Sequence, residues 1–419
     1  MKKAIDIPKG YKQSPVGVIP ADWEVKRLGE IGSFSKGYGV PKNKMISEGY
    51  PCLTYGDLYT KYDYLIENIH SYIDKKTASE SKAINKGDIL FAGSGETPED
   101  IGKCATYLGK ETIFAGGDII ILTPTKDYNS FVLSYILNSD IGGKQRYKYA
   151  QGHSVVHIYP DTLKKIQIPI PPLAEQQKIA EILSSWDKAI ELQTSIIDKL
   201  TLRKKGLMQQ LLTGKKRLKG FIEPWKQIMY GNILKEIRRD IQWDDNERYD
   251  LISVKRRSEG IFRRESLLGK EILTKTLGVV REGDFIISKM QIVHGASALV
   301  TSEFDGAKVS GSYIILVPKK RGELNIDFFN YWSQMPRFYH QTFLSSYGVH
   351  IEKMTFDIIV FLSHTMNLPD ISEQCAITDI LTNADNEIQK EKQKLEALKQ
   401  QKKGLMQQLL TGKKRVITK

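Results

Sequence analysis

The chain has 419 residues, of which 41% are hydrophobic, so it is long and apolar enough for two or three folded domains. Its 62 lysines and arginines outnumber 49 aspartates and glutamates, which gives a formal charge of +13 at pH 7. A chain this basic usually binds a polyanion, most often nucleic acid, although the charge alone is also compatible with a generally basic surface. No apolar run reaches the roughly 18 residues of a membrane span, the first residues lack the apolar core of a signal peptide, and the 3 cysteines have neither disulfide nor metal spacing. The composition therefore argues against a membrane protein or a disulfide-rich secreted protein, and predicts a cytoplasmic one.

After an N-terminal arm at 1–23, residues 24–168 show the pattern of a mixed α/β domain. Short β-branched runs such as 118–122 are bounded by Gly, Asn, Asp and Pro, and a helix is expected at 131–137. Basic and aromatic side chains gather in the expected loops, where they could contact DNA phosphates or base edges. Taken singly, each is more typical of a solvated surface charge, so the prediction depends on the clusters. The candidate DNA-binding residues here are Lys36, Tyr38, Lys42, Lys44, Lys144, Arg146 and Lys148.

Residues 169–214 form the first of two predicted spacer helices. Apolar residues recur in steps of four and three, the heptad pattern of a helix that pairs with another helix. Two seats of this pattern are polar, at Gln193 and Lys204. Pro172 stands before the helix and Gly214 is placed as its C-terminal cap. The predicted seam residues are Ile179, Leu183, Trp186, Ile190, Ile197 and Leu200.

A second domain at 215–366 and a second spacer helix at 367–412 repeat this organisation, and a basic tail follows at 413–419. The second domain carries its own candidate DNA-binding residues: Lys255, Arg256, Arg257, Arg263, Arg264, Lys289 and His350. The second helix has Ala384 where the first has Trp186, and Glu391 and Lys402 in its polar seats. Its predicted seam residues are Ile377, Leu381, Ile388, Leu395 and Leu398.

An internal duplication explains this arrangement. Residues 204–217 and 402–415 both read KKGLMQQLLTGKKR, 14 identical residues at an offset of 198. The match extends upstream without a gap, and a fainter similarity relates residues 87–90 to 283–286. A period near 200 residues is too long for a solenoid repeat, so the chain is interpreted as a duplicated domain followed each time by a long helix.

The two helices are predicted to pair antiparallel, because each carries an apolar stripe that it cannot bury alone. At 1.5 Å per residue, about 40 residues give a rod of roughly 60 Å. The predicted fold is α+β: two mixed α/β domains separated by two long antiparallel coiled-coil helices with a pseudo-two-fold axis. Such rods could hold two DNA-reading domains about one turn of DNA apart, roughly 34 Å. Gln193 and Glu391 either meet near the axis and set the register or simply reach solvent.

Motifs for catalysis are weak. Residues 91–95, FAGSG, resemble the glycine loop with which many DNA methyltransferases bind adenosylmethionine, but the catalytic partner motif is missing and the second copy reads ISKMQ. There is no phosphate-binding loop, and neither the carboxylates nor the 7 histidines have metal-ligand spacing. We therefore predict no catalytic residue and no metal site. Two alternatives remain open: a solitary DNA methyltransferase or nuclease with a fused recognition module, and a coiled-coil adaptor without DNA affinity.

The whole chain resembles the specificity subunit of type I restriction–modification enzymes. The resemblance is carried by residues 168–176, IPIPPLAEQ, by the helix end at 206–214, GLMQQLLTG, and by its repeat ending at 410–412. The second copy departs at 368–374, LPDISEQ, which lacks the double proline, so the second joint between domain and helix is expected to differ.

The resemblance implies that each mixed domain is a target recognition domain for one half of a split DNA sequence. It implies that the helices set the unread spacer and dock two methyltransferase subunits, which carry adenosylmethionine, and that restriction subunits using ATP and magnesium join them. No cofactor is expected in this chain. The exposed helix residues expected to dock the partners are Gln209, Gln210, Gln407 and Gln408.

Overall fold

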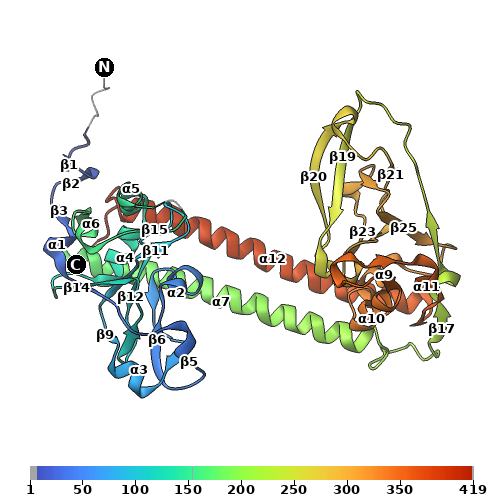
Figure 1. Cartoon of the computed structure of the whole chain (residues 1–419), viewed down its shortest axis with the longest axis horizontal. Coiled ribbons are helices and arrows are strands. Elements are labelled where there is room, and N and C mark those ends of the chain that lie inside the picture. Colours follow the sequence, from blue (N-terminus) through green and yellow to red (C-terminus); the bar gives the residue numbers. More distant parts are fainter. Residues whose placement is uncertain (1–6, 153, 418–419) are drawn as a thin grey trace. The chain divides into compact units, whose positions relative to one another are not determined.

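The computed structural model describes residues 7–152 and 154–417, without the side chain of Lys42. These residues form two compact units: one holds the described residues up to Gln193 and from Lys394 onward, and the other is Thr194–Gln393. Each unit contains two larger sheets, smaller two-stranded ones, and a part of both long helices, α7 (Leu173–Leu211) and α12 (Ile371–Leu409), of 39 residues each (Figure 1). In the described part of the chain no helix is long and apolar enough to cross a membrane.

The first unit is built on two five-stranded sheets. The first has the order β4-β14-β10-β12-β7, with only the β12–β7 pair parallel, and the second has the order β5-β8-β6-β13-β9. The strands of the first are β4 (Gly32–Lys36), β14 (Ile119–Pro124), β10 (Ile89–Ala92), β12 (Cys104–Tyr107) and β7 (Leu65–Ile66). Those of the second are β5 (Met45–Ile46), β8 (Tyr72–Ile73), β6 (Tyr50–Leu53), β13 (Ile113–Ala115) and β9 (Lys82–Ile84).

Helices α4 (Ser130–Asn138) and α5 (Asp140–Tyr149) complete the core of this unit. Asn129 caps α4 through its side chain, which accepts a hydrogen bond from the backbone N–H of Val132 at 3.2 Å. All residues from Phe131 to Leu137 are buried, so α4 is covered on every side, which is why this segment has no polar face. Shorter helices are α1 (Leu28–Ile31), α2 (Tyr55–Thr60), α3 (Lys75–Ser79) and α6 (Pro160–Leu163).

The second unit repeats the plan with two four-stranded sheets, in the orders β18-β25-β22-β23 and β20-β19-β24-β21. The strands are β18 (Leu234–Ile237), β25 (Tyr313–Pro318), β22 (Phe285–Ser288), β23 (Ser297–Leu299), β20 (Ile261–Leu268), β19 (Arg248–Val254), β24 (Lys308–Ser310) and β21 (Leu277–Val279). The helices are α8 (Tyr230–Ile233), α9 (Ile326–Trp332), α10 (Pro336–Leu344) and α11 (Ile358–Ser363). Strands β19 and β20 form a hairpin that is longer than any among the described residues of the first unit (Figure 1).

Four strands of each larger sheet have the same topology in the two units, and the first unit adds one edge strand to each sheet, β7 or β5. The run β4-β14-β10-β12 corresponds to β18-β25-β22-β23, and in both units the second sheet has one parallel pair, β6–β13 or β19–β24. The part of each unit between the long helices' ends, called below the first (24–170) or second (226–368) recognition region after the expectation from the sequence, is closed by a short antiparallel pair. The pairs are β3 (Glu24–Arg27) with β16 (Gln167–Ile170), and β17 (Lys226–Met229) with β28 (Thr365–Leu368). The fold therefore agrees with the duplication expected from the sequence.

Within each unit the two long helices run antiparallel. In the first unit the start of α7 lies against the end of α12, as the ion pairs Glu175–Arg415 and Asp187–Lys402 show. In the second unit the end of α7 lies against the start of α12, through Lys204 and Asp385. The apolar stripe faces inward: all eleven predicted seam residues are buried or half-buried, namely Ile179, Leu183, Trp186, Ile190, Ile197, Leu200, Ile377, Leu381, Ile388, Leu395 and Leu398.

Candidate nucleic-acid interface

The joint between the first recognition region and α7 is made by Glu175 and Gln176. Both side chains are buried. The Glu175 carboxylate accepts a hydrogen bond from the indole N–H of Trp23 at 2.9 Å and two from the guanidinium of Arg415, both at 2.9 Å. Gln176 accepts from the backbone N–H of Asn129, the cap of α4, at 2.8 Å. Because buried polar groups are costly without partners, these bonds hold the start of α7 to the region through Asn129, to the N-terminal arm through Trp23 and to the C-terminal tail through Arg415.

The second joint uses the same contacts. Glu373 accepts from Trp225 at 2.9 Å and from Arg217 twice at 2.7 Å, and Gln374 accepts from the N–H of Asn325 at 2.8 Å. The second joint differs, as expected, where the second proline is missing: Asp370 stands in place of Pro172 and accepts a hydrogen bond from the N–H of Glu373 at 2.9 Å. The missing second proline has no effect on these bonds, since the glutamine amide donates to the carbonyl of the first proline in both copies, Pro171 at 2.8 Å and Pro369 at 2.9 Å.

The two lysines at the polar positions of the heptad pattern, Lys402 and Lys204, have equivalent partners. Lys402 is buried, pairs with Asp187 and lies over the rings of Tyr64 and Tyr135 at 4.5 and 4.9 Å. Lys204 pairs with Asp385 at 2.6 Å and lies 5.2 Å from the centre of the Tyr331 ring. The cation thus has both an anion and an aromatic face near it, which offsets its loss of water. Burial raises the pKa of Tyr64 to about 12, so this phenol stays protonated.

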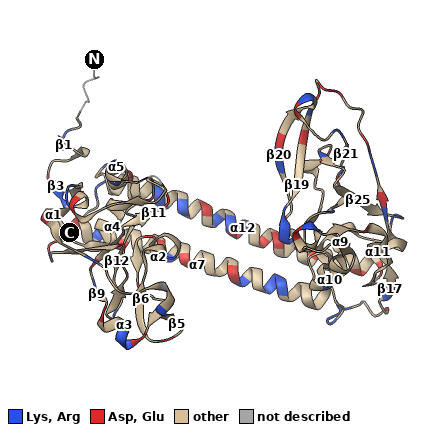
Figure 2. Cartoon of the chain, in the orientation of Figure 1, with Lys and Arg blue, Asp and Glu red and all other residues tan. Residues whose placement is uncertain are grey.

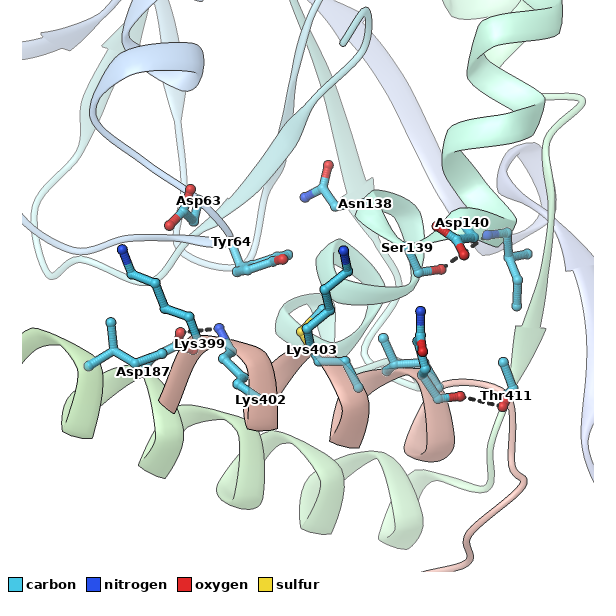
Figure 3. A pocket seen from close by; sticks show the side chains of 15 residues that line it. Asp63, Tyr64, Asn138, Ser139, Asp140, Asp187, Lys399, Lys402, Lys403 and Thr411 are labelled. Atoms are coloured by element: carbon cyan, nitrogen blue, oxygen red, sulfur yellow. Dashed lines mark hydrogen bonds and ion pairs between the residues drawn. The ribbon is translucent and has the colours of Figure 1, made fainter. Parts of the chain in front are cut away.

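A pocket of about 470 Å³ lies beside Lys402 in the first unit, between the α4–α5 corner and the end of α12. Asn138, Ser139 and Asp140 line one side. In Figure 3 the amino group of Lys403 reaches from α12 toward them, and that of Lys399 reaches toward Asp63. The predicted docking residue Gln407 also lines this pocket. All four docking candidates, Gln209, Gln210, Gln407 and Gln408, are exposed.

The basic residues of the first region gather partly at one end of the first sheet. Strands β4 and β10 are both antiparallel to β14, so Lys36 and Gly93, which follows β10, lie at the same end. The N–H of Gly93 donates to the carbonyl of Asp118 at 2.6 Å, and the Lys36 ammonium is 3.9 Å from the Asp118 carboxylate. Lys36 and Tyr38 are exposed there.

A polar pair that the sequence did not single out lies at this same end. The Ser94 hydroxyl is 2.9 Å from Nδ1 of His157, and the carbonyl of Ser94 accepts from the Tyr59 hydroxyl at 3.1 Å. These contacts join β11 (Ser94–Gly95) to β15 (Val156–His157). They also account for the glycine loop: a Cβ at Gly93 would be 2.8 Å from the Asp118 carbonyl, and one at Gly95 would be 2.7 Å from the Tyr59 hydroxyl. Close packing therefore explains the glycines.

Helix α5 separates its basic residues onto two faces. Lys144 and Lys148 are exposed, whereas Arg146 is 5% exposed. The Arg146 guanidinium donates to the carbonyls of Ile101, at 3.0 Å, and Leu137. The assignment of Arg146 to the DNA-binding set is corrected accordingly: two residues along a helix turn by about 200°, so a side chain between two exposed lysines points inward.

Two further candidates lie on the 3₁₀ turn η1 (Lys42–Lys44). Lys44 is exposed there, and the side chain of Lys42 lies outside the described residues.

In the second region three distant segments meet at the loop that joins β19 and β20. Arg256 in this loop donates to Gln291 at 2.7 Å and to Glu352 at 2.6 Å. The hydrogen bond from Arg256 holds the pKa of Glu352 below its ordinary value, so Glu352 is an anion at neutral pH. His350 accepts from the N–H of Glu352 at 3.4 Å, and Lys289 donates to the carbonyl of Gly311 at 3.3 Å. Figure 2 shows basic residues gathered at this loop.

The remaining basic candidates lie along β20. Arg263 is exposed, donates to the carbonyl of Glu303 at 2.6 Å and lies 5.6 Å from the centre of the Phe304 ring. Arg264 is exposed and is 3.7 Å from the Glu265 carboxylate. No group of three or more metal-ligating side chains was found among the described residues.

Comparison with known proteins gives consistent matches. The family model described as the type I restriction modification DNA specificity domain matches residues 20–202. The type I restriction enzyme MjaVIII specificity subunit of Methanocaldococcus jannaschii is 27% identical and covers 95% of this chain and 94% of its own. The crystal structure of a type I restriction–modification S subunit from M. genitalium has a TM-score of 0.56 at 14% identity, over 93% of this chain and 96% of that one. A chain from a structure titled for complex assembly and conformational transition of the type I R-M system has a TM-score of 0.58 at 16% identity, over 94% of this chain and 99% of that one.

Proposed function

Because the chain belongs to the family of type I restriction–modification specificity subunits, which are non-catalytic, we propose that its two recognition regions each read one half of a bipartite DNA target. One observation carries this proposal. The two regions share a topology and the glutamate and glutamine contacts of their joints, but the side chains at the same sheet end differ: Ser94 and His157 in one, Lys289 and the Arg256–Glu352 pair in the other. A common frame with different polar surfaces suits two different half-sites.

The long helices would set the unread spacer between the half-sites. Helices α7 and α12 each have 39 residues, which corresponds to about 58 Å at 1.5 Å per residue. At the start of each helix a glutamine is hydrogen-bonded to the recognition region before it, through Asn129 or Asn325. The neighbouring glutamate takes charge-assisted bonds from an arginine that follows the other long helix, Arg415 or Arg217. Such joints restrict the movement of each region relative to its helix. The length of the helices between the two joints would therefore determine the distance between the half-sites on DNA.

The identical segments 204–217 and 402–415 would dock two copies of one partner, a methyltransferase subunit. Several of their residues are exposed in both copies, including Gln209 and Gln407, so packing within the chain does not explain why they match. The same partner binding twice would explain it. In this proposal adenosylmethionine is held by the methyltransferase subunits, ATP and magnesium are held by the restriction subunits, and this chain holds no cofactor.

Methylation mapping of DNA from cells that carry the intact system tests the proposal. We expect a split motif with two specified halves and an unspecified spacer. A continuous motif would contradict the bipartite reading. Methyl transfer by the purified chain alone with adenosylmethionine would contradict the non-catalytic role. A salt titration of DNA binding adds a third test, because an adaptor without DNA affinity would show no fall of log affinity with log salt concentration.

A further inference from the structure

The loop that joins β19 and β20 holds two consecutive non-glycine residues in the left-handed region. Arg257 has φ 59° and ψ 29°, and Ser258 has φ 54°. Side chains with a Cβ rarely adopt this conformation, and it persists only where the surroundings impose it. Such positions cluster at binding and active sites.

Several contacts impose it here. The N–H of Ser258 donates to the carbonyl of Gly295 at 2.8 Å, and the hydroxyls of Ser258 and Tyr339 are 2.8 Å apart. The N–H of Lys255 donates to the carbonyl of Gly260 at 2.9 Å, which closes the loop. These bonds tie the loop to η4 (Ile292–His294) and α10, two elements of the same unit.

The two neighbouring arginines of this loop are in different situations. Arg256 is engaged by Gln291 and Glu352, so it braces the loop against the segment around η6 (Ile351–Lys353). Arg257 is exposed, and no hydrogen bond or ion pair within the described ranges 7–152 and 154–417 involves its guanidinium. The hydrogen bonds of the loop therefore hold the backbone of Arg257 in an unusual conformation, while its side chain is exposed to solvent.

We propose that Arg257 is a specificity-determining residue that reads a guanine in the half-site of the second region, an inference that rests on the proposed function. A guanidinium can donate two parallel hydrogen bonds to O6 and N7 of guanine in the major groove, the commonest base-specific contact of arginine. That contact requires a fixed direction of approach. A phosphate can be reached by a mobile lysine or arginine and requires no strained backbone, so the exposed neighbour Lys255 suits the phosphate instead.

The test compares variants of the complete specificity–methyltransferase complex by methylation mapping and by competition binding to oligonucleotides that differ at single positions. Arg257→Ala should relax the motif at one base pair of one half-site, lowering discrimination there by roughly 5- to 150-fold, while the other half-site and the spacer stay unchanged. Arg257→Lys keeps the charge but loses the two-pronged donor, and it should relax the same position.

Two controls separate the possible causes. Arg248→Ala removes an exposed arginine from the same hairpin, at the end of β19 away from the loop, and should leave the motif intact. Arg257→Gly removes the side chain where glycine relieves the backbone strain, so it should relax the motif without lowering the melting temperature.

An unchanged motif in Arg257→Ala, or equal weakening on every DNA sequence, would overturn the assignment of Arg257. The wild-type motif reports separately on the proposed function: if it were not bipartite, the proposed function itself would fail, whatever the variants show.

Discussion

Leu183→Ala is expected to lower the stability of the first unit by about 3 kcal/mol. Leu183 is 0% exposed on α7 and belongs to the core cluster that joins this helix to β10, α4 and the end of α12. Replacing an enclosed leucine by alanine removes its burial and leaves a cavity, which together cost about 2–5 kcal/mol in other cores. Leu381 occupies the equivalent position in the second unit, also at 0% exposure, so Leu381→Ala should cost a similar amount there.

The matched control is Leu192→Ala, the same substitution on the same helix at a side chain that is 57% exposed, with an expected cost of about 0.5 kcal/mol or less. Denaturant unfolding gives the overall change in free energy of unfolding, and hydrogen exchange locates it. Protection should fall in the first unit for Leu183→Ala and in the second for Leu381→Ala. Equal effects at Leu183 and Leu192 would refute the argument that Leu183 is enclosed in the core formed by α7, the first recognition region and the end of α12.

Three further predictions follow from particular contacts. Arg146→Ala should lower the melting temperature without changing the DNA motif, because it removes buried hydrogen bonds to the carbonyls of Ile101 and Leu137; a motif change with unchanged melting would contradict this. Lys255→Ala should reduce the slope of log affinity against log salt by about 1 and leave the motif intact, as measured by salt titration of the complex. Burial raises the pKa of Cys52 to about 11 and of Cys104 to about 12, so almost no thiolate forms there at pH 8, and a thiol reagent should modify only the exposed Cys375 until the chain unfolds.

The long helices could be predicted closely from the sequence. Their limits in the structure, Leu173–Leu211 and Ile371–Leu409, fall within the expected 169–214 and 367–412, because an exact repeat and a heptad pattern are both local signals. The antiparallel pairing followed from the need to bury two stripes. The polar positions of Lys204 and Lys402 in the heptad pattern could also be predicted. The partners of Lys402 could not, since Tyr64 and Tyr135 are far from it in the sequence.

The candidate interface was less predictable because its contacts join distant residues. Trp23 meets Glu175 across 152 positions and Arg256 meets Glu352 across 96, and no local pattern announces either pair. Arg146 was misassigned because a cluster of charges in sequence says nothing about which face of a helix each residue occupies. The left-handed backbone at Arg257 also has no signal in the residue itself, since arginine is not a residue that favours it.

The most direct test of the proposed spacer-setting role is a matched pair of seven-residue insertions, one after Gln193 and one after the equivalent Glu391. Seven residues preserve the heptad pattern and lengthen each helix by roughly 10 Å, close to 3 base pairs of DNA. Methylation mapping should then show both half-sites unchanged and the spacer longer by about 3 base pairs. An unaltered spacer in a complex that still methylates DNA would contradict the claim that these helices set the distance.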